Sequence, residues 1–198
     1  MIPVITISRE FGSGGHSIGL KVSKALNIPF LDGEIIGKAA EKELEKKQSL
    51  KSSEIKKDGS KEFYNIPAAS TMYFSSSQDD MFKLQKEIII DAAKKGPCVI
   101  VGRCSDFILS NEDIKSLNIL IHADINFRKD RILKRYGEIK NVGIEKRILK
   151  KDKQRSTYYK YYTDQTWGAY KNYDLALDSG RIGEENCVKM ICDLANIF

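Results

Sequence analysis

The fold of this chain is decided by the stretch Ile5-Thr-Ile-Ser-Arg-Glu-Phe-Gly-Ser-Gly-Gly-His-Ser-Ile-Gly19. An apolar, β-branched run from Val4 to Ile7 predicts a buried strand, and four glycines within the next residues predict a loop. Apolar residues at helical spacing follow: Ile18, Val22, Ala25 and Leu26. Strand, glycine loop and helix in this order suit an anion, because converging backbone N–H groups and a helix N-terminus attract negative charge. A plain structural turn has the same composition, so the stretch alone leaves both interpretations open.

The loop fits the phosphate-binding pattern G-x-x-x-x-G-K-[ST] only in part. Gly15 takes the second glycine and Ser17 the hydroxyl that binds Mg²⁺, whereas Glu10 stands at the first glycine and His16 at the lysine. We expect phosphate to lie on the loop residues Gly12, Ser13, Gly14, Gly15, His16 and Ser17, with Ser17 also as the metal ligand. Without the lysine, the positive charge would come from protonated His16, from Arg9 just before the loop, or from an arginine of a lid.

Composition narrows the class of protein. The 198 residues, 41% of them hydrophobic and 30% charged, suit one soluble globular domain. No apolar run approaches the ~20 residues of a membrane span and the N-terminus enters a strand directly, so we expect a cytoplasmic protein without signal peptide or membrane contact. Four cysteines without C-x-x-C spacing and two histidines disfavour zinc and favour reduced thiols. The net charge of +6 suits an anionic ligand; we expect no nucleic acid as partner, and the oligomeric state stays open.

Strands and helices alternate along the rest of the chain. Further strands are predicted at 29–32, 97–102, 117–122 and 173–177. Helices are predicted from 33 into the forties with Ile35, Ile36, Ala39, Ala40 and Leu44 inward, from Asp79 as cap to Gly96, from Asp124 to Gly137, over 144–162 and over 184–197. The polar stretch 41–61 predicts a solvated helix end and a flexible loop, and 70–77 predicts another loop. The alternation predicts a doubly wound α/β fold.

Several charged residues directly follow predicted strands. Ligands of doubly wound folds bind outside the carboxyl ends of the strands. The glycine loop, Asp32, Arg103 and Asp178 all stand at such ends, so we expect them to share one crevice. Arg103 either clamps an anion in bidentate fashion or forms an ion pair with Asp106.

A cationic segment precedes the last strand. Phosphoryl transfer needs positive charge around the transferred group, a metal and a lid that excludes water. Lys150-Lys-Asp-Lys-Gln-Arg155, preceded by Arg147, lies where a nucleotide kinase carries its lid, although a solvated helix face is the alternative. Asp152 and Arg155 are three apart and share a face. The aromatic residues that follow either stack a base or pack the lid onto the core: Tyr158, Tyr159, Tyr161, Tyr162 and Trp167.

Together these residues resemble the cytidylate kinase-like family of P-loop nucleoside monophosphate kinases. The stretch from Arg9 to Gly19 is similar to the family's variant of the phosphate loop, and the similarity is weakest from about 41 to 77. Short motifs at corresponding places also resemble the family: Phe30-Leu31-Asp32-Gly33, Gly102-Arg103, Asp152-Lys-Gln-Arg155 and Asp178-Ser179. The resemblance implies a P-loop kinase-like three-layer α/β/α sandwich with a mainly parallel five-stranded sheet. It also implies a single domain, 1–198, with a helical acceptor-binding insertion at about 33–86 and a lid at about 138–168.

The resemblance further implies an ATP- and Mg²⁺-dependent kinase that phosphorylates CMP, dCMP or a related small acceptor. From the place of His16 in the loop and from the cationic segment we expect His16, Arg147 and Arg155 to be catalytic. By the resemblance the acceptor-binding residues are Asp32, Lys38, Arg103, Asp152 and Arg155. The sequence departs from the family in two places: His16 replaces the lysine, and the third strand ends without the acidic residue that helps to hold the metal. A catalytically weak nucleotide-binding or regulatory protein on the same fold is therefore the alternative. Small-molecule nucleotides are the expected partners in both cases.

Overall fold

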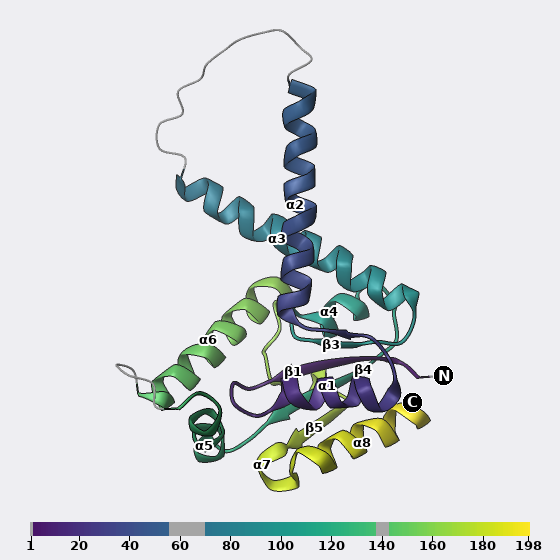
Figure 1. The fold of residues 1–198 in the computed structure, drawn as a ribbon, viewed down its shortest axis with the longest axis vertical. Coiled ribbons are helices and arrows are strands. Elements are labelled where there is room, and N and C mark those ends of the chain that lie inside the picture. Colours follow the sequence, from purple (N-terminus) through teal and green to yellow (C-terminus); the bar gives the residue numbers. More distant parts are fainter. Residues whose placement is uncertain (1, 56–69, 138–142) are drawn as a thin grey trace.

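A computed structural model describes residues 2–55, 70–137 and 143–198 (Figure 1). The strands are β1 (Val4–Arg9), β2 (Phe30–Leu31), β3 (Val99–Val101), β4 (Ser116–His122) and β5 (Leu175–Asp178). The helices are α1 (Gly15–Leu26), α2 (Gly33–Ile55), α3 (Ser70–Lys95), α4 (Ser105–Ser110), α5 (Ile125–Tyr136), α6 (Ile144–Thr163), α7 (Ser179–Ile182) and α8 (Glu184–Ile197), with a 3₁₀ turn at Tyr170–Asn172. No helix of these described ranges is both long and apolar enough to cross a bilayer.

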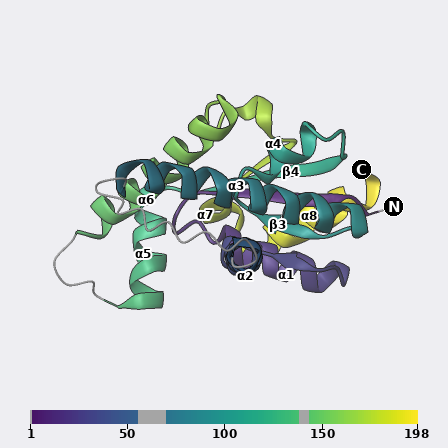
Figure 2. The ribbon, with the colours of Figure 1, turned by 90° about the horizontal axis from the view of Figure 1, so that it is seen from above.

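The five strands form one parallel sheet in the order β2-β3-β1-β4-β5. The central strands are rich in Val, Ile and Leu, and most of their residues are buried because both of their faces are covered. In the register of the sheet, Ile7 lies between Val101 and Ile119. Helices cover both faces (Figures 1 and 2), so the prediction of a three-layer α/β/α sandwich with a parallel five-stranded sheet is confirmed.

Two apolar clusters hold the layers together. On one face, α1 and α8 pack on the sheet through Ile18, Val22 and Ile191. On the other face, α3 and α4 bury Ile89 and Ile108 against the sheet. Each fully buried side chain of this size stabilises the fold by roughly 1.5–3 kcal/mol, so these two clusters fix the positions of the strand ends.

Two predicted inward residues are exposed instead. Ala25 of α1 is exposed, and Ser23 is buried in its helix because the Ser23 hydroxyl donates to the carbonyl of Ile28 at 2.7 Å. Ile35 is 48% exposed, whereas the neighbouring Ile36 is fully buried. A helix face of ~100° holds only some of the apolar residues of a window, so composition alone overestimated the inward set.

Both predicted ends of α5 are confirmed, and α1 also ends in a regular cap. Asn27 ends α1 in the left-handed conformation, and Asp124 caps α5 by accepting the N–H of Asn126 at 2.8 Å. Gly137 follows the last residue of α5.

The helices next to the chain segment 56–69 are longer than predicted. The prediction of a loop within 41–61 is wrong up to Ile55, which is the last residue of α2, and the remainder lies outside the described residues. The prediction of a loop at 70–77 is wrong, because α3 begins at Ser70. Asp79 consequently lies inside α3 rather than at its cap. Lys and Glu are good helix formers, so the polar composition marked solvent exposure and not the end of the helix.

Candidate functional site

The glycine loop joins β1 to α1 as predicted. Gly14 precedes the helix with φ +88°, a left-handed conformation that L side chains rarely adopt, and α1 begins at Gly15. The Ser13 hydroxyl donates to the carbonyls of Glu10 at 2.9 Å and Ile121 at 3.1 Å, which anchors the loop to β4. The free N–H groups of the first helical turn and the positive end of the helix dipole therefore face the space above the loop.

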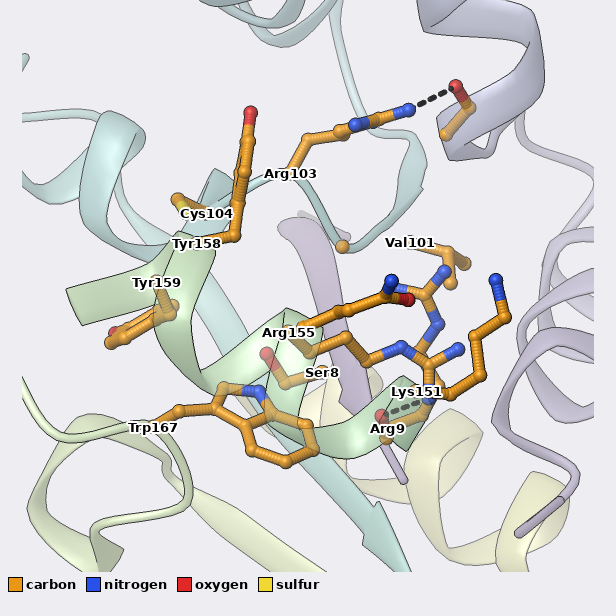
Figure 3. A pocket seen from close by; sticks show the side chains of 13 residues that line it. Ser8, Arg9, Val101, Arg103, Cys104, Lys151, Arg155, Tyr158, Tyr159 and Trp167 are labelled. Carbon is orange, nitrogen blue, oxygen red and sulfur yellow. Dashed lines mark hydrogen bonds between the residues drawn. The ribbon is translucent and has the colours of Figure 1, made fainter. Parts of the chain in front are cut away.

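Two adjoining cavities lie at the carboxyl ends of the strands. The first, which we name the loop cavity, has about 610 Å³ and is lined by the glycine loop, Asp32 and Arg131 among others. The second, the inner cavity, has about 370 Å³ and lies between the end of β3 and helix α6, with Tyr158 and Trp167 in its wall (Figure 3). The structure thus brings residues of the loop, of the second and third strands and of α6 to one place, although they are far apart in sequence.

Three arginines line both cavities. Arg9 ends β1, Arg103 follows β3 and Arg155 lies on α6. Figure 3 shows Arg9 and Arg155 side by side, with Arg103 across the inner cavity from them. Arg155 donates to the Arg9 carbonyl at 3.2 Å, and Arg103 donates to the carbonyl of Gly33 at 3.1 Å. This arrangement concentrates positive charge where the two cavities meet.

His16 and Asp32 face the loop cavity as a pair. The Nε2 atom of His16 lies 2.8 Å from Oδ2 of Asp32. Asp32 also accepts the N–H groups of Ile35 at 2.8 Å and Glu34 at 2.9 Å and so caps α2. Burial opposes ionisation of Asp32, but the two backbone hydrogen bonds and the contact with His16 outweigh it and lower the pKa of Asp32. His16 therefore contacts a carboxylate of the second strand end.

Other predicted site residues lie outside both cavities. Lys38 pairs with Glu34 at 2.6 Å on the exposed side of α2, because residues four apart share a helix face. Arg147 lies with its guanidinium carbon 6.0 Å from the ring centroid of Phe11. Asp178 caps α7 by accepting the N–H groups of Gly180 and Arg181, so the expectation that it shares the crevice is wrong.

Asp152 holds the loop to helix α6. Its Oδ1 atom accepts the N–H of Phe11 at 2.7 Å and lies 3.3 Å from Arg155, and its Oδ2 atom accepts from Arg128 at 2.6 Å. Both carboxylate oxygens are thus engaged by protein groups, and Asp152 lines neither cavity. The prediction that Asp152 contacts the acceptor did not include these interactions. In this structure Asp152, itself on α6, links this helix to the loop through Phe11 and to α5 through Arg128.

Glu184 and Arg131 are site residues that sequence reasoning missed. Glu184, in the first turn of α8, accepts from the Ser17 hydroxyl and pairs with Lys21 at 3.0 Å and with Arg131 at 2.8 Å. These hydrogen bonds outweigh its burial and lower the pKa of Glu184. Arg131 is thereby held over the glycine loop, 3.0 Å from where a Cβ on Gly14 would lie. The sequence signal that could have pointed to Glu184 is its place in the first turn of the last predicted helix, where the helix dipole favours a negative charge.

The described side chains do not form a ready magnesium site. No group of three or more His, Cys, Asp or Glu residues within them could hold a metal ion. The Ser17 hydroxyl is bound by Glu184, whose charge is neutralised by Lys21 and Arg131. In phosphate-transferring sites Mg²⁺ keeps several waters and is bound by one or two carboxylates together with substrate phosphates, so these side chains alone would not hold the ion.

The expected alternative for Arg103, an ion pair with Asp106, is not formed. Asp106 is 5% exposed and accepts the hydroxyl of Tyr159 at 2.8 Å, which links α4 to α6. Across the described residues, no carboxylate lies within ion-pair distance of Arg103. Its guanidinium instead lies 5.9 Å from the ring centroid of Tyr158.

Replacing Asp106 by asparagine should raise the melting temperature at pH 8 and give no gain at pH 4. Burial raises the pKa of Asp106, and the hydrogen bond from Tyr159 only partly opposes it. An acid with a raised pKa in the folded state costs stability as the pH climbs from its ordinary value, near 4, through the folded value. Asparagine does not titrate and still accepts from Tyr159. Thermal melts from pH 4 to 8 check this, with the exposed Asp91→Asn as control; equal shifts at both pH values would contradict it.

The solved structures that resemble this chain include small-molecule kinases. The fold matches a shikimate kinase from Bacteroides thetaiotaomicron with a TM-score of 0.56 and 10% identity, over 98% of each chain. It matches a gluconokinase from Sinorhizobium meliloti 1021 with a TM-score of 0.53 and 15% identity, over 99% of this chain and 95% of the other. An uncharacterized protein from Eubacterium ventriosum has a TM-score of 0.71 and 26% identity over 98% of both chains. The fold is that of the P-loop kinases.

Sequence comparison narrows this class to one family. The model of the cytidylate kinase-like family matches residues 4–181, and the chain belongs to this family of nucleotide-binding phosphotransferases. The cytidylate kinase of Archaeoglobus fulgidus is 32% identical over 107 residues, which are 54% of this chain and 56% of the relative. That of Methanococcus maripaludis strain C5 is 30% identical over 112 residues, 54% of this chain and 62% of the relative. The chain thus spans little more than half the length of these curated relatives.

Proposed function

We propose that this protein transfers the γ-phosphoryl group of ATP, supplied as Mg·ATP, to a nucleoside monophosphate, with CMP or dCMP as the acceptors that its curated relatives suggest. The observation that carries the proposal is the set of three arginines shared by two adjoining cavities, one of which lies over the glycine loop. Two phosphate-bearing substrates can meet there with their charges compensated. The loop cavity takes the triphosphate and the inner cavity the acceptor.

Phosphoryl transfer depends mainly on the positions of the two substrates and on positive charge around the transferred group. In phosphoryl transfer the charge spreads over the oxygens of the transferred group, and fixed cations that match this charge lower the barrier. Arg103 and Arg155 approach the meeting point from opposite walls, the first held by Gly33 and the second by the Arg9 carbonyl. Magnesium bound to the phosphates supplies further neutralisation of the charge. Trp167 and Tyr158 in the wall of the inner cavity give apolar surface for a base.

The second candidate is a nucleotide-binding or regulatory protein with weak activity. The engaged Ser17 hydroxyl and the lack of a metal-binding cluster in the described residues favour it. Thermal shift with CMP, dCMP, AMP, UMP and ATP, with and without Mg²⁺, separates the two, together with direct detection of the diphosphate product. Stabilisation by ATP and by one monophosphate, with product formed, supports the kinase. A response to a single nucleotide without product supports the binding protein and overturns the proposal of catalysis.

A further inference from the structure

The backbone shifts the register of the phosphate-loop pattern by one residue. In this pattern the second glycine is the last residue of the loop, and the lysine that follows it is the first residue of the helix. In this structure that residue is Gly14, with φ +88°, whereas Gly15 already belongs to α1. Counting back from Gly14 places Arg9 at the first glycine of the pattern, and counting forward places Gly15 at the lysine. His16 then occupies the next position, which explains why its side chain contacts Asp32 rather than the loop.

Arg9 and a side chain at position 15 exclude one another. A Cβ built on Gly15 would overlap the Cβ of Arg9 and would lie 3.1 Å from its Cγ. The overlap involves the base of the arginine side chain, which no change of rotamer at its far end relieves. The pattern normally combines a glycine at the strand end with a lysine at the helix start. This chain has the reverse arrangement, a long cation at the strand end and a glycine at the helix start.

The surroundings of Arg9 leave its charge available to an anion. A Cβ on Gly102 would overlap the guanidinium of Arg9, so a second glycine makes room for it. Among the residues that the structure describes, no carboxylate pairs with Arg9. Arg9 lines the inner cavity (Figure 3) and also the loop cavity. Burial, and then repulsion by Arg155 and Arg103, lower the pKa of Arg9 to about 9, with Asp32 opposing them. The guanidinium stays charged at pH 7, and an anion that enters would offset the repulsion from the two neighbouring arginines.

We propose that Arg9 supplies the fixed positive charge that a lysine supplies in the ordinary phosphate loop, and that it binds the terminal phosphates of a nucleoside triphosphate between the two cavities. This inference rests on the proposed function, because it assigns Arg9 a role at the same site. A guanidinium binds two phosphate oxygens at once through a planar fork, whereas an ammonium acts as a point charge. The charge therefore does not depend on the protonation of His16.

The experiment transfers the positive charge from position 9 at the end of β1 to position 15 at the start of α1. Arg9→Gly should lower turnover of the wild-type reaction by ~10²–10³-fold, the loss typical of one preorganised donor, and should weaken binding of ADP measured by calorimetry. Gly15→Lys alone should lower the melting temperature, because Arg9 occupies the space. The double variant Arg9→Gly with Gly15→Lys should recover at least tenfold of the lost turnover and the affinity for ADP. Arg181→Ala, an exposed arginine of α7 outside both cavities, is the matched control and should change neither quantity.

The outcomes separate this inference from the proposed function. If the wild type phosphorylates a monophosphate and Arg9→Gly does so equally well, the role of Arg9 is wrong and the kinase assignment stands. If the wild type binds ADP but forms no product, loss of ADP binding in Arg9→Gly and its recovery in the double variant support Arg9, while the kinase assignment falls. Arg9→Gln, which keeps the bulk of the side chain, should reproduce the loss. A wild-type chain that binds neither ADP nor ATP overturns both.

Discussion

Replacing Asp152 by alanine should lower the free energy of unfolding by about 3 kcal/mol, because it leaves a buried cation without its main partner. Arg128 is 7% exposed and donates to Oδ2 of Asp152 at 2.6 Å. The carboxylate of Glu10 would remain 3.6 Å from Nε of Arg128. We therefore expect a loss of stability at the lower end of the range for broken buried ion pairs. The same substitution removes the acceptor of the Phe11 N–H, so the glycine loop loses its link to α6. Urea denaturation monitored by circular dichroism measures the effect.

The controls for Asp152 separate charge from packing. Asp130→Ala removes an exposed carboxylate of α5 and should change stability by no more than about 0.5 kcal/mol. Adding Arg128→Met to Asp152→Ala should restore part of the loss, because an apolar side chain needs no partner in a buried place. A loss under 1 kcal/mol for Asp152→Ala, or no recovery in the double variant, would show that this buried ion pair does not hold the loop.

Replacing Arg155 by alanine should lower turnover by ~10²–10³-fold and leave most of the stability intact. Arg155 lines both cavities and is only partly buried, and its guanidinium lies 5.6 Å from the ring centroid of Phe11. Burial lowers the pKa of Arg155, and Asp152 opposes this, so the side chain is charged at pH 7. Without it, the phosphates lose a cation on the wall opposite Arg103. Steady-state kinetics and calorimetry with ADP measure the change.

The matched control for Arg155 is Lys153→Ala, two residues away on the same helix. Lys153 is exposed and lines neither the loop cavity nor the inner cavity. It should change turnover less than twofold. If Arg155→Ala unfolds the protein while its turnover per folded molecule is unchanged, Arg155 is a structural partner of Asp152 and not part of the site.

The architecture could be predicted because its signals are local. The apolar runs of β1, β3 and β4 and the glycines between β1 and α1 specify strand, loop and helix within a few residues of each other. The start of α2 and the end of α3 were predicted correctly, but the end of α2 and the start of α3 were not, because the Lys, Glu and Ser residues there have the same composition as a solvated loop. The short helices α4 and α7 were missed for a different reason: at six and four residues they have no periodicity to recognise.

The candidate site could be predicted only where residues follow strands. Asp32 and Arg103 were found in this way, and both line the loop cavity. Asp152 was assigned to the acceptor by resemblance, whereas its partners Arg128 and Phe11 come together only through tertiary packing. Glu184 was missed because its contact with Ser17 joins residues that are 167 positions apart. Whether Gly14 or Gly15 precedes the helix could not be decided from adjacent glycines, since only the backbone conformation distinguishes them.

The close approach of position 9 to positions 15 and 102 restricts how this chain can evolve. A side chain with a Cβ at position 9 requires that position 15 lack one, so these two sites cannot change independently. At position 102 a Cβ would meet only the far end of Arg9, but the φ of +79° there already favours glycine. Ancestors and descendants that carry a lysine at position 15 should have a small residue at position 9, and intermediates with both cations should be selected against. Reconstructed ancestral sequences would show whether the two substitutions occurred on the same branch.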